Sequence, residues 1–512
     1  MSTLFAKSQR LSCDGACAAH TLERCEISTP FWTLIPTLVS ERGGVLLDSS
    51  LGAPAVGRFS FIGMDPVAVF AARRNDPRSH PFDADIEVTR YRSATGEMNP
   101  LVGNSQQPST DHSRGDVLES LRGLLGEYAV SFEPRSEELF PLLGGAIGFF
   151  GYEAGSWGGP GEKIKTASDS SIPDVYFALY DQLLCHDHAT NETYISTIGR
   201  GGTMPGARAA AAQSTGSLRE RLQNPTVRRE SHPVEGDATP QGPDPYPEPR
   251  GCFDSAEYCG AVARIRDHIE AGDIYQACMT QRFENRLGTG DPWQLYCQLR
   301  EANPAPFACY LQTPTFSIVS ASPERYLAVN RQGTAESRPI KGTRPRGETA
   351  AMDAALRKEL SESSKDRAEN VMIVDLVRND FGRVCRFGSI EVSDLMQIET
   401  YATVFQMVST VRGDLQSECD ALDLVRATFP GGSMTGAPKI EAMKILDRLE
   451  PVRRGVYAGG IGYLDYAGSM DLNMVIRSFI IEDRNVFYHG GGGIVADSIP
   501  EAEYQESLDK LV

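Results

Sequence analysis

Lys341 lies in a stretch rich in proline and glycine, "SRPIKGTRPRG", which runs from Ser337 to Gly347 and predicts a turn. A lysine amine is a nucleophile only after it has lost its proton, a state that burial or a nearby cation favours. In solvent, the same side chain would be an ordinary loop charge. From the residues alone, Lys341 is therefore either a buried nucleophile or a solvated cation.

A pair of carboxylates is expected on one face of a helix further along the chain. "SESSKDRAENVMIVDLVRND" begins with Ser363 three residues before Asp366, which is the spacing of a capping box. The apolar run that follows predicts a helix from about Lys365. Asp366 and Glu369 are three residues apart and would share one face of it.

A second acidic pair lies near the C-terminus, in "SIPEAEYQESLDKLV". Glu503, Glu506 and Lys510 would share one face of a helix. Mg²⁺ prefers one or two carboxylates, several waters and an anionic substrate, so the two acidic helices could hold one such cation between them. The alternative is that both pairs are solvated helix surface.

Two glycine-rich runs could approach an anion. "FPGGSMTGAPKIEAMKIL" places Ser433 and Thr435 directly before a predicted helix, whose first N–H groups favour negative charge. "YHGGGGIVADS" puts glycines at the end of a predicted strand, where backbone could approach a ligand closely. Either run could instead be only a tight turn, and neither has the spacing of a P-loop.

Composition points to a globular protein that binds a small molecule. The net charge of -18 argues against a nucleic acid or an anionic membrane as partner. No apolar run has the length of a membrane span and the start lacks the apolar core of a secretion signal, so we expect a cytoplasmic protein. The 11 cysteines are scattered, which favours free thiols over a disulfide framework.

The pattern along the chain predicts two lobes. The first lobe, residues 1–223, has short β-rich runs from Phe31 to about Arg221. The Pro/Gly-rich segment 224–251 predicts a flexible linker, and residues 252–512 alternate helices with strands. "SAEYCGAVARIRDHIEAGD" is expected to be a helix, and "IYQACMTQRFE" the strand after it. The second lobe carries the candidate chemistry.

Six motifs in this order resemble the chorismate-utilising enzymes. They are "SASPERYL", "RPIKGTRPRG", "KDRAENVMIVDLVRND", "FPGGSMTGAPK", "GGIGYLDYAGSMDLNMVIRS" and "GGGGIVADSIPEAEYQESLDK". The resemblance is dense from about Ser255 to Val512 and looser in the first lobe. It implies an α+β fold, a layered sandwich of two large, mostly antiparallel sheets with helices outside.

The resemblance also implies roles for single residues. Glu369 and Glu506 would bind Mg²⁺, with Asp366 and Glu503 close by, and Glu324 in "SPER" matches the family's general acid. The positions that match substrate contacts are Ser433, Tyr457, Arg477, Gly491, Gly492, Gly493 and Lys510.

Three positions bear on which reaction the chain performs. Family members that add water carry a lysine base where this chain has Gln276, as the ammonia-using members do. Lys341, in "PIKGT", is similar to the aminodeoxychorismate synthases, in which this lysine is thought to add covalently to the ring. Gln406 stands where many relatives have a histidine associated with the aminated intermediate.

The expected function is that of aminodeoxychorismate synthase component I, a transferase that aminates chorismate at carbon 4. Its product would lead to 4-aminobenzoate for folate biosynthesis. A glutamine amidotransferase partner or free ammonium would supply ammonia, because no cysteine of the chain lies in a glutaminase nucleophile motif. The alternatives are anthranilate synthase component I and a silent subunit that senses an amino acid, such as tryptophan, at Asp48 and Ser49.

Overall fold

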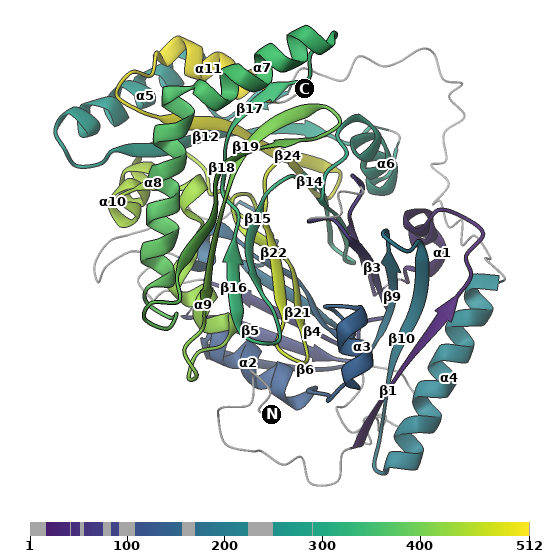
Figure 1. Cartoon of the computed structure of the whole chain (residues 1–512). Coiled ribbons are helices and arrows are strands. Elements are labelled where there is room, and N and C mark those ends of the chain that lie inside the picture. Colours follow the sequence, from purple (N-terminus) through teal and green to yellow (C-terminus); the bar gives the residue numbers. More distant parts are fainter. Residues whose placement is uncertain are drawn as a thin grey trace, which may run out of the picture.

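Two twelve-stranded antiparallel sheets pack against each other, and helices lie around them (Figure 1). The computed structural model describes residues 17–40, 42–51, 56–74, 83–91, 108–155, 169–223, 249–288 and 290–510. This arrangement confirms the predicted α+β sandwich.

The first sheet contains, in spatial order, β1 (Cys17–Cys25), β10 (Glu192–Gly201), β9 (Gln182–Asp187), β3 (Phe59–Met64), β2 (Gly44–Asp48), β13 (Phe307–Gln312), β14 (Phe316–Ser322), β23 (Ser478–Glu482), β24 (Asn485–Ile494), β12 (Gln276–Arg286) and β11 (Arg250–Gly251), and β20 (Gly436–Ala437) pairs with β12.

The second sheet contains β17 (Ile340–Pro345), β19 (Val404–Asp414), β16 (Thr334–Ser337), β15 (Arg325–Val329), β22 (Met470–Met474), β21 (Gly460–Asp465), β7 (Gly145–Phe150), β8 (Val175–Tyr180), β4 (Ala68–Arg73), β5 (Asp83–Arg90) and β6 (Ser109–Asp116), and β18 (Glu391–Thr400) pairs with β19.

Both sheets mix strands from the two halves of the chain. In the first, β2 pairs with β13, and in the second, β7 pairs with β21. The division into lobes 1–223 and 252–512 stays a prediction, and most of the predicted linker lies outside the described residues. The topology adds that neither half has a sheet of its own.

The main core lies between the sheets and is largely aromatic. Phe61 on β3 faces Tyr463 on β21 with ring centroids 6.0 Å apart, and Phe149 on β7 faces Phe316 on β14 at 6.0 Å. Each pair joins one sheet to the other. Burying rings of this size contributes much of the stability of such a core.

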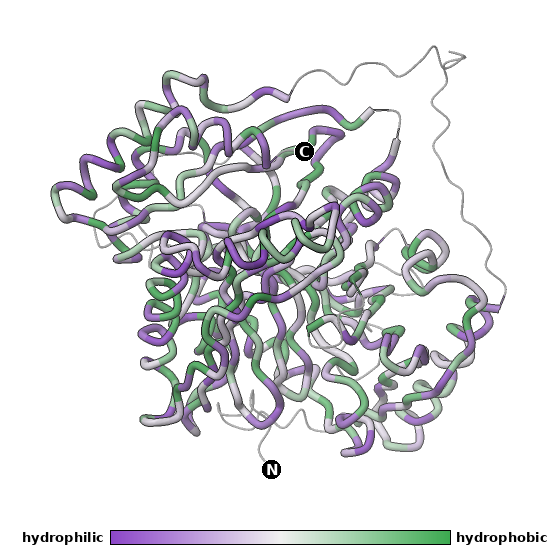
Figure 2. The backbone as a smooth tube through the Cα atoms, turned by 45° about the horizontal axis from the view of Figure 1, so that its top comes forward, coloured by the Kyte–Doolittle hydropathy of each residue, from purple (hydrophilic) through white to green (hydrophobic). Residues whose placement is uncertain are grey.

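The helices are α1 (Ile35–Leu38), α2 (Val117–Glu127), α3 (Pro134–Leu139), α4 (Met204–Gln223), α5 (Ser255–Glu270), α6 (Pro292–Ala302), α7 (Ala350–Glu362), α8 (Ser364–Phe381), α9 (Ala421–Thr428), α10 (Lys439–Leu449) and α11 (Pro500–Asp509), with 3-10 turns η1 (Phe31–Leu34), η2 (Tyr152–Gly155) and η3 (Gly432–Met434). Hydrophilic and hydrophobic stretches alternate along the outer helices (Figure 2). Among the described residues, no helix has the length and apolar character needed to cross a membrane.

Helix α8 begins where its sequence predicts. The Ser363 hydroxyl oxygen accepts the Asp366 N–H at 3.2 Å, which satisfies a donor that the first helical turn leaves free. The helix packs on β19 and β17, so its acidic residues reach the strand that carries Lys341.

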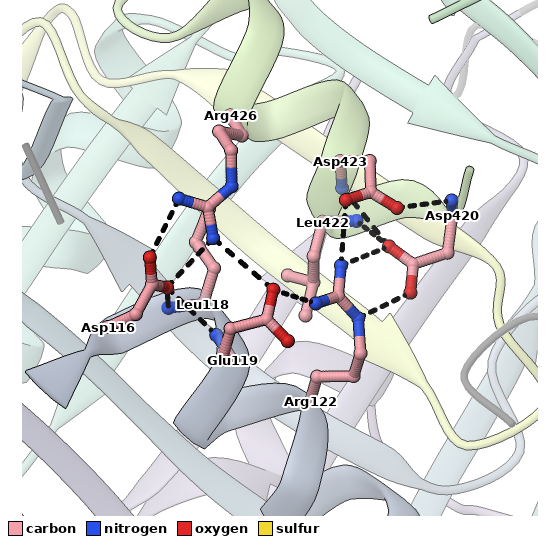
Figure 3. A network of polar contacts seen from close by, with 8 residues as sticks. All are labelled: Asp116, Leu118, Glu119, Arg122, Asp420, Leu422, Asp423 and Arg426. Carbon is pink, nitrogen blue, oxygen red and sulfur yellow. Dashed lines mark hydrogen bonds and ion pairs between the residues drawn. The ribbon is translucent and has the colours of Figure 1, made fainter. Parts of the chain in front are cut away.

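Helices α2 and α9 are joined by a reciprocal ion network, although some 300 residues separate them in sequence (Figure 3). Asp116, the N-cap of α2, accepts two hydrogen bonds from Arg426 on α9, both at 2.8 Å. Asp420, the N-cap of α9, accepts from Arg122 on α2 at 2.7 and 3.0 Å. Each arginine therefore stabilises the start of the other helix.

Candidate active site

Lys341 lies on strand β17, so the turn predicted from its proline and glycine neighbours is wrong. The pairing with β19 shifts register between Ile340 and Thr343, and this irregularity contains Lys341. Gly342 has φ of +84°, and a Cβ on it would lie 2.8 Å from the Asp366 Cγ. The proline and glycine therefore make a bulge in an edge strand, which redirects a side chain and lets α8 approach.

The Lys341 amine is largely shielded from solvent and faces a carboxylate. Its Nζ lies 4.0 Å from the Glu369 Oε2, and the two side chains are 14% and 15% exposed. Burial raises the pKa of Glu369, and the positive charge of Lys341 opposes that rise. The negative charges of Asp366 and Glu506 raise it further, so the carboxylates of α8 and α11 influence one another across the site.

Glu324 lies between β14 and β15 and is buried. Burial raises the pKa of Glu324 to about 7, against smaller lowering effects of a hydrogen bond from Ser433 and the charge of Lys341. Ser433 is buried in the 3-10 turn η3. A buried carboxyl that is half protonated near pH 7 can donate a proton at physiological pH.

The glycine strand β24 lies directly against the acidic face of α11. A Cβ on Gly492 would lie 3.1 Å from the Glu503 Oε2 and 3.2 Å from the Glu506 Oε1. Burial raises the pKa of Glu503, although a hydrogen bond from Ser498 opposes the rise. The absence of a side chain at Gly492 leaves room for these carboxylates and a ligand beside the backbone.

Lys510, just beyond α11, joins this helix to β24. Its Nζ donates to the Gly491 carbonyl at 2.6 Å and lies 2.7 Å from the Glu506 Oε1. Among the described residues, no group of three or more His, Cys, Asp or Glu side chains could hold a metal ion by itself.

Gln276 begins strand β12 and is buried, 1% exposed. A Cβ on Gly493 would lie only 2.1 Å from the Gln276 Nε2, so the Gln276 amide occupies the space that a side chain at residue 493 would take. The Gln276 Oε1 has no hydrogen-bond partner among the described residues. It is an acceptor available to a ligand.

Tyr457 and Arg477, two further predicted site residues, contact side chains outside the predicted site. Tyr457 is buried, and its ring stacks on His489 with centroids 4.5 Å apart and the planes 9° from parallel. Arg477 has φ of 50°, and its guanidinium donates to the Asn303 Oδ1 at 3.4 Å. In the described part of the chain, no hydrogen bond or ion pair joins Arg477 to the other predicted site residues.

Asp48 and Ser49 lie elsewhere, on the wall of a cavity of about 1030 Å³ between the sheets. The Asp48 carboxylate already accepts hydrogen bonds from Arg300 at 2.6 Å and Tyr296 at 2.8 Å. An amino-acid effector at this position stays a prediction, and its ammonium group would have to compete with Arg300. Gln406 is buried on β19 opposite Thr343, two residues from Lys341 on the neighbouring strand.

The contacts join the main candidates into one continuous site. In order of contact or electrostatic influence, they are Ser433, Glu324, Lys341, Glu369, Glu506, Lys510, Gly491, Gly492, Gly493 and Gln276. These residues come from both sheets, from α8 and the end of α11, from η3 and from the connection between β14 and β15. Arg454 and Glu450, which no sequence motif singles out, bind the backbone next to these residues.

A largely shielded lysine beside carboxylates, a buried carboxyl with a pKa of about 7 and a glycine strand suit a small anionic substrate. Residues 81–512 match the model of the chorismate binding enzymes. The chain belongs to this family and is an enzyme that acts on chorismate.

Two relatives carry the same description. The chain is 34% identical to aminodeoxychorismate synthase component 1 of Bacillus subtilis (strain 168), over 92% of this chain and 90% of that protein. It is 39% identical to aminodeoxychorismate synthase component 1 of Klebsiella aerogenes, over 83% and 88% respectively. Among solved structures, anthranilate synthase component I from Streptococcus pneumoniae TIGR4 is similar, with a TM-score of 0.69, 30% identity and coverage of 88% of this chain and 91% of that chain.

Proposed function

We propose that this protein is aminodeoxychorismate synthase component I, which replaces the 4-hydroxyl of chorismate with an amino group. The observation that carries the proposal is that Lys341 lies near enough to the buried Glu324 for its charge to lower the pKa of that carboxyl. The positive charge of the shielded Lys341 amine acts on the buried Glu324 carboxyl and opposes the rise of its pKa to about 7. The names of the bacterial relatives support the same reaction.

In the proposed first step, the neutral Lys341 amine forms a bond to the chorismate ring as the C4–O bond breaks. Glu324 gives its proton to the departing hydroxyl, which leaves as water. Ammonia then forms a bond at carbon 4 as the bond to Lys341 breaks. The new ammonium group loses one proton, which returns Glu324 to its acid form, so the net reaction is chorismate plus ammonia giving 4-amino-4-deoxychorismate plus water.

Glu369 and Glu506 would hold Mg²⁺, with Glu503 and Asp366 close by. The oxygen donors suit this hard cation, and the space at Gly492 gives two of the carboxylates room beside the backbone. The cation would supply positive charge for a substrate carboxylate. Lys510, Ser433, Tyr457 and the backbone of Gly491 to Gly493 would complete the binding site, and Arg477 would have to turn from Asn303 to join them.

Gln276 would bind the ammonia through a hydrogen bond. Its buried Oε1 lacks a partner within the described residues and can accept a hydrogen bond from an N–H donor. A separate glutamine amidotransferase is the proposed source, and free ammonium would substitute for it. An amide cannot act as a base toward water, so Gln276 favours amination over hydroxylation.

Amination at carbon 2 with loss of pyruvate, as in anthranilate synthase component I, is the second candidate. The similarity to the Streptococcus pneumoniae structure favours it. Lys341 argues against it, because direct attack by ammonia at carbon 2 needs no amine nucleophile from the protein.

Product identification tests the proposal. Purified protein is incubated with chorismate, Mg²⁺ and an ammonium salt, and the products are analysed by chromatography and mass spectrometry before and after addition of an aminodeoxychorismate lyase. We expect 4-aminobenzoate only with the lyase, and a loss of at least about 100-fold in the aminated product for Lys341→Ala. Anthranilate formed without the lyase would overturn the proposal.

A further inference from the structure

Arg454 is buried, 3% exposed, behind the active site and binds two of its backbone segments at once. Its Nη1 donates to the Met434 carbonyl at 2.6 Å, in the turn that carries Ser433. Its Nη2 donates to the Cys278 carbonyl at 2.7 Å, on β12 two residues beyond Gln276. One guanidinium therefore fixes how far the Ser433 turn stands from the Gln276 strand.

Glu450 extends this arrangement to the glycine strand. It accepts from the Arg454 Nε at 2.8 Å and from the Nη2 at 2.6 Å. The Glu450 Oε1 also accepts both the N–H and the hydroxyl of Thr280 at 3.1 Å. Thr280 is paired with Gly491 on β24, so the Arg454–Glu450 pair supports the glycine strand through β12.

The backbone of Arg454 is anchored as firmly as its side chain. Its N–H and that of Gly455 donate to the two carboxylate oxygens of Glu153, at 2.9 and 3.0 Å. Its carbonyl accepts the Tyr457 N–H at 3.2 Å, so the same turn sets the place of Tyr457. The guanidinium lies over the Tyr152 ring, 4.5 Å from the centroid.

We propose that Arg454 is a positioning residue that sets the mutual geometry of the Ser433 turn, the Gln276 strand and the Tyr457 turn. The inference rests on the proposed site and concerns how that site is held. Only an arginine can do this, because its planar fork directs four hydrogen bonds to three acceptor residues at fixed angles. A lysine at the same place keeps the charge but cannot reach Met434, Cys278 and Glu450 together.

The test compares Arg454 with an arginine of nearly the same environment outside the site. Arg200 is also buried, donates to both oxygens of Asp181 at 2.7 and 2.9 Å and to the Tyr128 carbonyl at 2.8 Å, and lies over the Tyr128 ring. Arg454→Ala, Arg454→Lys and Arg200→Ala are measured for Tm and for kcat and KM of chorismate consumption at saturating ammonium. The assay measures the loss of chorismate and does not depend on which product forms. A product aminated at another carbon would therefore overturn the proposed function and leave this inference intact.

We expect kcat per folded molecule to fall about 100-fold in Arg454→Ala, because misplacement of reacting groups by about 1 Å costs that much. Guanidinium chloride at non-denaturing concentration should restore part of the rate. Arg454→Lys should lose a similar factor in kcat while retaining a higher Tm. Arg200→Ala should lower Tm, because it breaks a buried ion pair, but leave kcat per folded molecule close to the wild-type value. If Arg454→Ala does not fold, the same measurement of kcat per folded molecule on Arg454→Lys and Glu450→Gln decides the question. If the rate falls only in proportion to the amount of folded protein, in the Arg454 variants as in the Arg200 variant, the inference is overturned.

Discussion

Glu324 is a single residue whose environment predicts the pH dependence of the reaction. Burial raises its pKa to about 7, and the proposed step uses its protonated form. The protonated fraction of Glu324, and with it proton donation to the departing hydroxyl, should therefore fall as pH rises through about 7. We expect kcat, measured at a constant concentration of free ammonia, to show this limb in the wild type.

Glu324→Gln is the matched variant, because the amide keeps the size and the hydrogen bond to Ser433 but cannot donate a proton. It should lower kcat by about 10²- to 10⁴-fold and remove the limb near pH 7. The free energy of unfolding of the wild type should also fall as pH rises. Because the pKa is raised in the folded state, the protonated form stabilises the fold below the ordinary pKa and this contribution is lost as pH rises through about 7. A wild-type profile without a transition near pH 7 would exclude Glu324 as the acid.

Sequence pattern identifies single residues well when their partners are side chains and poorly when they are backbone atoms. Residue type and spacing drew attention to Lys341 and Glu369, and the resemblance to the chorismate-utilising enzymes then gave roles to these two residues and to Glu324. Arg454 was not, because two of its acceptors are the carbonyls of Met434 and Cys278, which any residue would supply. No spacing rule reveals such a contact.

At the scale of elements, local signals predicted α8, α5 and β12 because caps and periodicity are encoded within each segment. Strand β17 was not predicted. Its proline and glycine pattern is typical of a turn, and only pairing with β19, about 60 residues away in sequence, makes it an edge strand. Tertiary contact overrides local preference in such segments.

The network between α2 and α9 predicts unequal losses of stability. The side chains of Arg122 and Asp420 are 11% and 7% exposed, so Arg122→Met leaves a buried carboxylate without its cation. We expect a loss of about 3 kcal/mol in the free energy of unfolding. Arg426→Met should cost about 1 kcal/mol or less, because Arg426 and Asp116 are each 32% exposed. Denaturant unfolding of the two variants beside the wild type measures both, and equal losses would contradict the assignment.

At the scale of the whole molecule, the interleaved sheets predict how the chain can be divided. Without residues 1–223, β13 would lose β2 and β21 would lose β7, leaving two unpaired edges and an exposed face of the aromatic core. Exposed edges of this kind favour aggregation. We therefore expect residues 252–512 expressed alone to aggregate or to unfold without a cooperative transition.

The same topology predicts that the two fragments complement each other. Co-expressed 1–223 and 252–512 should copurify and consume chorismate, because each supplies the missing strands of both sheets. The control is the full chain cut after folding at a protease site inserted within residues 224–248, which tests whether a covalent connection is needed once the sheets have formed. If the 252–512 fragment alone unfolds cooperatively and consumes chorismate at the rate of the cut full chain, the second half is an autonomous domain. Shared sheets would then not be required for the active site.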